Sequence, residues 1–291
     1  MDANGTLYGA GHSHRAGGHW PVRPASHHLR CHHPRWSIQP GNHILTGPPV
    51  FSRRRLDRGR AYNFAGGSDS SSPDALAVDT NGVLYGATAG TGLDGSFSTV
   101  FSLTPPSSPG GAWTFALLGT YTSVSPFVLS IGHTAGGLAV LYITGDGVFS
   151  LTAPQTPGNP WTQATLSAAA ANGPVAFGKN GVLYLTIVGG VASGSVFSLT
   201  PPRSPGGAWT SRTLHKFVSE EVNSPLAGVV IGQGGVLYGT GTRGKSDYSP
   251  GGVFSLTPPS ASGQPWTYTG VVAFTNAEGR DPVVPLIWNN G

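Results

Sequence analysis

The stretch "VFSLTPPSSPGGAWT", residues 100–114, decides the fold, because its parts return along the chain in a fixed order. The pentapeptide VFSLT occurs four times, at 100–104, 148–152, 196–200 and 253–257. A Trp-Thr pair follows each copy, and the tryptophan always stands 13 residues after the valine. The copies are 48, 48 and 57 residues apart. A repeat of this length has to be recognised before any local motif is interpreted.

Each repeat unit reads as four strands. In the first complete unit, "PDALAVD" (73–79) and "VLYGAT" (83–88) are apolar runs joined by an Asn-Gly turn, which is typical of a β-hairpin. "TVFSLTP" alternates in the manner of a two-faced third strand. "PPSSPGG" cannot continue a strand, because proline lacks the donor and glycine weakens pairing. "AWTFALLGTY" is then the fourth strand.

Units of about 40–50 residues with four strands each are typical of propeller blades. We therefore expect an all-β, β-propeller-like fold with about five four-stranded blades, one of them damaged. A β-solenoid is the alternative, although its coils are usually shorter. The units cover about 73–121, 126–170, 174–217 and 225–274, all within a repeat domain at 61–291. Residues 1–10, with Leu7-Tyr8, and 282–291 are partial units.

Composition agrees with short strands and many turns. The 291 residues include 45 glycines and 25 prolines, and only 10% are charged. No apolar run is long enough to span a membrane, and no signal peptide is expected in this chain. The single cysteine, Cys31, excludes an internal disulfide framework.

The basic character of the chain belongs to one segment. Residues 1–60 contain nine of the 16 Lys and Arg and two of the 12 Asp and Glu. The arginine-rich "SRRRLDRGR" (52–60) stands where a unit should show "PPSSPGGAWT". Read one base later, the codons of "PPVFSRRRLDR" permit that missing sequence. The shifted reading does not restore a VFSLT copy upstream. The alternatives of more than one frameshift, or of a different boundary for the shifted segment, therefore stay open.

Our hypothesis is that roughly Gly11–Arg60 is a frameshifted translation of an ordinary repeat. We predict that sequencing codons 11–60 and the upstream DNA shows an insertion, a deletion or an upstream frame that continues the repeat. Peptides from 11–60 found by mass spectrometry in the native protein, with the DNA sequence unchanged, would contradict the hypothesis.

Two candidate sites fall inside this segment. "HHLRCHHP" (27–34) contains metal-binding residue types but lacks the paired spacing of a zinc finger. "RRRLDRGR" (53–60) has the basic composition of a patch that binds nucleic acid but lacks interleaved aromatic residues. We expect no metal, no cofactor and no specific nucleic-acid partner. If the segment is made as written, its arginines bind polyanions non-specifically.

The repeated aromatic residues have two interpretations. Four tryptophans form either a sugar-stacking surface or a packing position of every blade: Trp113, Trp161, Trp209 and Trp266. Three tyrosines either ring a channel mouth or pack: Tyr85, Tyr184 and Tyr238. Packing is favoured for both sets, because buried aromatic residues dominate core energetics.

The remaining polar candidates are weak. Asp79-Thr80-Asn81-Gly82 offers oxygen ligands for calcium, but other copies have Gly178 or Gly232 in place of the aspartate, which favours a turn. His133 and His215 are lone histidines without a paired acid or nucleophile in a known motif. No GxSxG, HExxH or phosphate-binding loop is present. No catalytic, cofactor-binding or metal-ligating residue is therefore assigned.

The motif "NGVLYGAT…VFSLTPP…PGGAWT" resembles the GloVer-type tandem repeat family of bacterial proteins. Asn81–Thr88 and Val100–Pro106 carry the match, and Gly235–Thr240 with Val253–Pro259 carry it again. The copy at 126–166 departs from it, because "LAVLYITGDGVF" has lost most of the loop between the second and third strands. The resemblance implies a propeller-like protein that is extracellular or attached to the cell surface, and it implies no chemistry.

Three functions are open at this stage. The first is a non-catalytic binding or scaffold module, with a surface glycan or a protein as its ligand. The second is a propeller lyase or hydrolase, which would need histidines and acids clustered in the central channel. The third is a damaged fragment without a function, favoured by the start inside a repeat and the missing signal peptide. The sparse, unrepeated charges favour the first, so we expect no enzyme activity.

Overall fold

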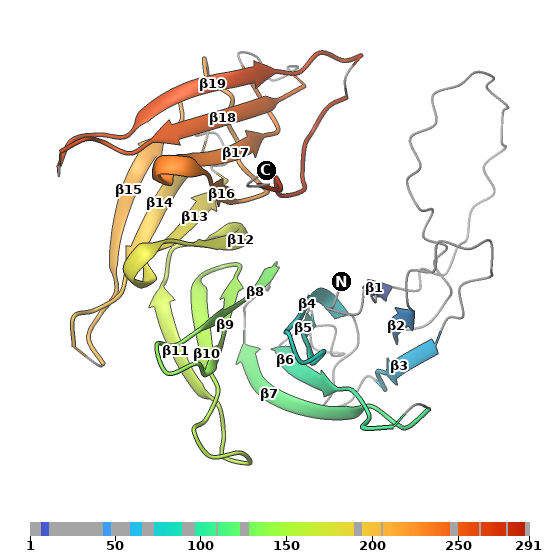
Figure 1. Ribbon diagram of the computed structural model, residues 1–291. Coiled ribbons are helices and arrows are strands. Elements are labelled where there is room, and N and C mark those ends of the chain that lie inside the picture. Colours follow the sequence, from blue (N-terminus) through green and yellow to red (C-terminus); the bar gives the residue numbers. More distant parts are fainter. Residues whose placement is uncertain are drawn as a thin grey trace, which may run out of the picture.

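The computed structural model describes twelve stretches of the chain. They are 7–11, 43–47, 59–65, 73–88, 97–108, 110–122, 128–188, 194–204, 206–244, 250–261, 263–277 and 279–288. These stretches contain nineteen strands and two short 3-10 turns, Lys179–Gly181 and Gln233–Gly235. The strands form four four-stranded sheets and one three-stranded sheet, arranged in a fan around a central space (Figure 1). The predicted all-β, propeller-like fold is confirmed.

Each four-stranded sheet is an antiparallel blade whose strands are ordered as in the chain. The first blade contains β4 (Pro73–Val78), β5 (Leu84–Thr88), β6 (Phe97–Thr104) and β7 (Thr114–Thr122). The second contains β8 (Val128–His133), β9 (Ala139–Thr144), β10 (Val148–Thr152) and β11 (Thr162–Ser167). The third contains β12 (Asn172–Phe177), β13 (Leu183–Ile187), β14 (Ser195–Thr200) and β15 (Thr210–Lys216). The fourth contains β16 (Val229–Ile231), β17 (Leu237–Gly241), β18 (Gly252–Thr257) and β19 (Thr267–Ala273).

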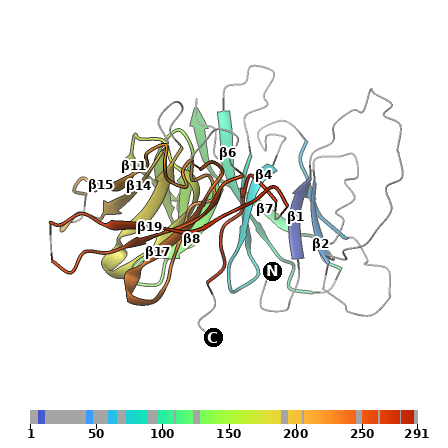
Figure 2. The same ribbon diagram turned by 90° about the horizontal axis from the view of Figure 1, so that it is seen from above.

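The first strand of each blade lies innermost. β4 lies beside β8, β8 beside β12 and β12 beside β16, so that successive blades follow one another around the fan. Figure 2 shows the same blades from above. Short hairpins join the strands within a blade, which explains why the sheet order follows the chain.

The apolar core lies between successive blades, and the VFSLT strand explains why. Because neighbouring side chains point to opposite faces, the valine and the leucine of this strand serve different interfaces. Val148 of the second blade packs with Leu183 and Leu199 of the third. Val196 of the third blade packs in the same way with Leu237 and Leu256 of the fourth. We call the valine side of a blade its forward face and the leucine side its rear face.

Gly86 and Phe101 show a close cross-strand packing inside the first blade. The two residues are paired between β5 and β6, and the Phe101 ring lies directly over the glycine. Gly239 and Phe254 repeat the arrangement in the fourth blade. An aromatic ring over a glycine covers backbone that would otherwise be exposed.

The turn at Asp79 connects the first two strands of its blade. The Asp79 carboxylate accepts hydrogen bonds from the backbone N–H groups of Asn81, at 2.8 Å, and Val83, at 2.9 Å. Gly82 follows with a φ of 79°, a conformation that glycine adopts without strain. The favoured interpretation of Asp79–Gly82 as a turn is confirmed.

We predict that Asp79→Ala lowers the free energy of unfolding by about 1 kcal/mol, because two backbone donors lose their acceptor. Asp79→Asn keeps an acceptor oxygen and should lose less. Urea denaturation followed by tryptophan fluorescence measures both. Equal losses in the two variants would show that the side-chain acceptor does not matter.

The N-terminal sheet contains three strands, β1 (Leu7–Gly11), β2 (His43–Gly47) and β3 (Gly59–Asn63). β2 comes from the segment that the frameshift hypothesis excludes from the fold, yet it pairs in register with β1. Backbone hydrogen bonds suffice for such pairing, whatever side chains are present. The histidine-cysteine motif at 27–34 lies outside the described residues, as do the arginines at 53–58.

The partial units at 1–10 and 282–291 predict that the two ends of the chain share one blade, in which Pro282–Trp288 pairs beside Thr6–Gly9 and closes the ring. This expectation is wrong for the structure: the described residues 279–288 form no strand, and β1 pairs only with β2. Pro282 and Pro285 explain part of the difference, because each removes one donor from a strand ladder. The segment instead follows the fourth blade, where the Asp281 N–H donates to the Pro250 carbonyl at 3.0 Å.

Candidate functional site

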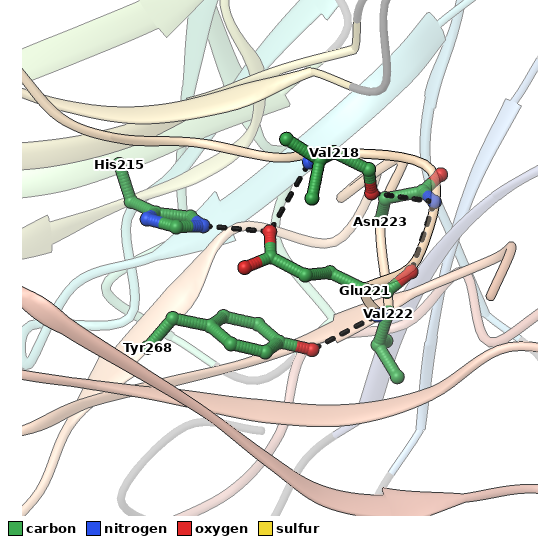
Figure 3. A network of polar contacts seen from close by, with 6 residues as sticks. All are labelled: His215, Val218, Glu221, Val222, Asn223 and Tyr268. Atoms are coloured by element: carbon green, nitrogen blue, oxygen red, sulfur yellow. Dashed lines mark hydrogen bonds and ion pairs between the residues drawn. The ribbon is translucent and has the colours of Figure 1, made fainter. Parts of the chain in front are cut away.

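A connected group of polar contacts surrounds His215, near the end of β15 (Figure 3). Its Nε2 lies 2.8 Å from Oε2 of Glu221, which stands in the turn that follows the strand. The same carboxylate oxygen accepts a hydrogen bond from the Val218 N–H at 3.1 Å. The two side chains are 18% and 17% exposed, so the pair is mostly withdrawn from water.

The sequence shows no paired acid for His215 in a known motif, and the structure adds one that the sequence does not mark, Glu221. The two residues meet because the turn after β15 brings the chain back over the strand, and six residues separate them in the sequence. This spacing matches no known catalytic motif, so sequence reasoning had no signal for it. His133, by contrast, is exposed at the end of β8.

Tyr268 of β19 joins this group from the next blade. Its ring stacks on the His215 imidazole with the centroids 5.2 Å apart, and its hydroxyl accepts a hydrogen bond from the Val222 N–H at 2.9 Å. Burial raises the pKa of the Tyr268 hydroxyl; the Val222 hydrogen bond lowers this pKa and the Glu221 carboxylate raises it further. The tyrosine therefore stays uncharged at neutral pH.

Asn223 continues the network along the turn. Its amide nitrogen donates to the Glu221 carbonyl at 2.9 Å, and its backbone exchanges hydrogen bonds with Arg243, which follows β17. Every polar contact of the network thus holds the turn in place between the third and fourth blades. A histidine beside a carboxylate also has the arrangement of an oriented general base.

The position of the group argues against a channel site. His215 and Tyr268 lie on β15 and β19, the outermost strands of their blades, and not on the inner strands that face the central space (Figure 1). Among the residues that the structure describes, no three His, Cys, Asp or Glu side chains come together as a metal site. The described part of the chain also contains no helix long and apolar enough to cross a membrane.

The repeated aromatic residues pack between blades, as favoured from the sequence. Trp161 of the second blade lies edge-on against Tyr85 of the first, with ring centroids 5.9 Å apart. Trp266 and Tyr184 repeat this contact at the junction between the third and fourth blades, also at 5.9 Å. The other tryptophans, Trp113 and Trp209, are half-buried against interblade clusters. Tyr238 stacks on Trp288.

A shallow hollow of ≈ 560 Å³ lies on the loop between β14 and β15. It is lined by Thr200, Pro201, Pro202, Arg203, Ser204, Gly207, Ala208 and Thr210. The loop is a repeated turn: the Gly207 N–H donates to Ser204, and the Gly111 N–H donates to Ser108 in the first blade, both at 3.1 Å. The hollow therefore reflects the turn that ends each VFSLT strand.

We predict that Glu221→Ala lowers the free energy of unfolding by about 1–2 kcal/mol, because the Val218 N–H and the His215 ring lose their charged acceptor. Glu220→Ala, at the exposed neighbouring position, is the matched control and should change stability by less than about 0.5 kcal/mol. Urea denaturation of both variants checks the prediction. Similar losses would show that the Glu221 contacts contribute nothing.

Comparison with known proteins leaves the family open. No protein-family model matches the chain, and no curated protein matches it. Among solved structures, the chain is similar to the PQQ-bound aldose sugar dehydrogenase from Streptomyces coelicolor. The identity is 13% and the TM-score 0.48, over 83% of this chain and 81% of that one. It is also similar to a bifunctional GH43-CE protein of Bacteroides eggerthii, with 15% identity and a TM-score of 0.39, over 84% of this chain and 32% of that one.

The repeated sheets themselves define the class. Four antiparallel blades follow in one order, each with its first strand innermost, and each of the first three shares its core with the next blade. The chain is a β-propeller-like repeat protein.

Proposed function

We propose that this chain is a non-catalytic binding or scaffold module of the GloVer-type tandem repeat family that works outside the cell or at its surface. One observation supports the proposal most: the repeated residues of the motif are used for packing and for turns. The valines, leucines and tryptophans form the interblade cores, and Asp79 holds a turn. The His215–Glu221 pair also lies in a junction between blades, where its contacts hold a turn.

Ligand binding is assigned to the loops between the second and third strands. Their sequences differ from blade to blade: "AGTGLDGS" (89–96), "GGVAS" (189–193) and "KSDYS" (245–249). These residues lie outside the described chain, but the strands that flank them pair in equivalent registers in three blades, so the flanking strand ends lie at the same end of each blade. Variable loops on a repeated scaffold are where such proteins bind. A surface glycan or a protein is the proposed ligand.

An array of surface glycans and surface proteins, probed with the purified chain, tests the proposal. We expect binding that is lost when 245–249 is replaced by a Gly-Ser loop of equal length, with the melting temperature unchanged. Replacing the exposed residues at 155–156, in a different kind of loop, is the matched control and should leave binding intact. Absence of binding to every member of the array would overturn the proposal.

A propeller enzyme is the second candidate, and the His215–Glu221 pair is the observation that favours it. A panel of hydrolase and lyase substrates, run with the wild type and with His215→Gln, decides between the two. The binding module predicts no turnover in either protein. Turnover by the wild type that is lost in His215→Gln would replace the proposed function by the enzyme.

A further inference from the structure

The forward face of the fourth blade is exposed where every earlier forward face is covered. The valine that opens VFSLT is fully buried in the first three blades, at Val100, Val148 and Val196, whereas Val253 is partly exposed. A second position, on the outermost strand, shows the same contrast. Leu166 and Leu214 are 8% and 9% exposed, but the equivalent Val271 is 53% exposed.

The repeat itself identifies what fits this face. In the first three blades, the leucines of the next blade cover the forward face, on strands two and three of that blade. The exposed face around Val253 and Val271 therefore has the shape of a surface that receives strands two to four of another blade. Exposed apolar patches of this kind mark interaction sites.

The carboxyl-terminal segment 281–288 already occupies the place of the first strand of such a blade. Trp288 stacks on Tyr238 with ring centroids 5.2 Å apart, as Phe177 at the end of β12 covers Tyr142 at 5.4 Å. The backbone conformation supports the same equivalence with the start of a blade. Asp281 has a φ of 53° before Pro282, and Ser224 has a φ of 57° before Pro225 at the start of the fourth blade. Yet Val284 and Ile287 remain 69% and 94% exposed.

The N-terminal sheet has the complementary gap. β1 carries Leu7-Tyr8-Gly9, which corresponds to Leu84-Tyr85-Gly86 of β5, the second strand of the first blade. In the register, Gly9 pairs with Leu45 as Gly86 pairs with Phe101. β1 to β3 therefore stand for strands two to four of a blade, and the first strand is missing from the described sheet.

Segment 281–288 and the N-terminal sheet, which together would make one complete blade, lie apart within one chain. β1 lies beside β4. Trp288 instead lies against Tyr238 of β17 and Gly232, which follows β16, and these strands stand across the central space from β1 (Figure 1). Bringing them together in one chain would mean reshaping the junctions between blades. Those junctions contain fully buried side chains such as Phe254 and Leu256, and close-packed interfaces resist bending.

We propose that a second copy of this chain completes the blade. The N-terminal sheet of one copy packs on the forward face of the fourth blade of the next. Segment 281–288 of that next copy then lies along the free edge of β1, in the place of a first strand. The contact joins two different surfaces, head to tail, so it builds either closed rings or open chains of copies. It also pairs the edge of β1 that has no partner strand in the described sheet, and unpaired strand edges are templates for unspecific pairing.

Light scattering after size exclusion, run on the full chain over a hundredfold range of concentration, tests the proposal. We expect masses of two or more copies that fall towards one copy on dilution. Val271→Asp should weaken the association at least tenfold. Leu117→Asp is the matched control, because Leu117 is also an exposed apolar residue, 46% exposed, on the outermost strand of its blade. Circular dichroism of both variants establishes that each keeps the wild-type fold.

Three outcomes would overturn the proposal. One is a single-copy mass at every concentration with 281–288 open to hydrogen exchange. Another is a single-copy mass with 281–288 protected, which would show that the chain closes on itself. The third is an assembly that Leu117→Asp weakens as much as Val271→Asp.

Discussion

Phe254→Ala lowers the free energy of unfolding by about 3–5 kcal/mol, the expected cost of removing a buried phenylalanine side chain. Phe254 is fully buried and lies at the junction between the third and fourth blades. Its ring meets Phe217 edge-on at 4.9 Å and covers Gly239 on the neighbouring strand. The glycine offers no side chain to fill the space, so the cavity cannot collapse easily.

Urea denaturation, with the midpoint and slope fitted for each variant, measures this loss. Phe177→Ala is the matched control. The Phe177 ring also makes an interblade contact, with Tyr142, but this side chain is 43% exposed. We expect the control to lose about 1 kcal/mol. Comparable losses at the two positions would show that the junction core is not where the stability of the blades resides.

Gly86→Ala is expected to lower the free energy of unfolding by about 1–3 kcal/mol, because an added methyl group overpacks the blade. A Cβ at this position would overlap the Phe101 ring, with Cε1 at only 2.7 Å. Phe101 is itself fully buried, against Phe64 and Phe115, and has no free space to move into.

A double-mutant cycle measures whether the clash is the cause. Phe101→Leu removes the ring that meets the new methyl group, so the losses of the two single variants should not add in the double variant. Gly136→Ala is the control: its added Cβ would meet only Thr134 Oγ1 at 3.8 Å, and it should cost little. Additive losses in the cycle would refute the proposed contact.

Much of the fold could be predicted from the repeat. The strand order within a blade follows from local signals, since hairpin turns such as Asp79–Gly82 join strands that are neighbours in the chain. The roles of Trp161 and Trp266 followed from their recurrence, because a residue repeated in every unit has the same surroundings in every unit.

The polar network and the two ends could not be predicted. His215 meets Glu221 through an irregular turn, and Tyr268 arrives from a strand 53 residues away, so no periodic pattern in the sequence marks their meeting. The closure predicted from the terminal fragments failed because similarity of sequence says which strand position a segment takes, but not which neighbour it pairs with.

The sequence by itself determined the strands, their order in each blade and the residues that pack, because alternation and turn chemistry act over a few residues. The tertiary structure alone decided that the blades form an open fan and that Trp288 stacks on the fourth blade. It also decided that Val271 stays exposed while Leu214, its equivalent, is buried. Those outcomes depend on how each interblade core directs the next sheet, which is a sum of contacts between residues distant in the chain.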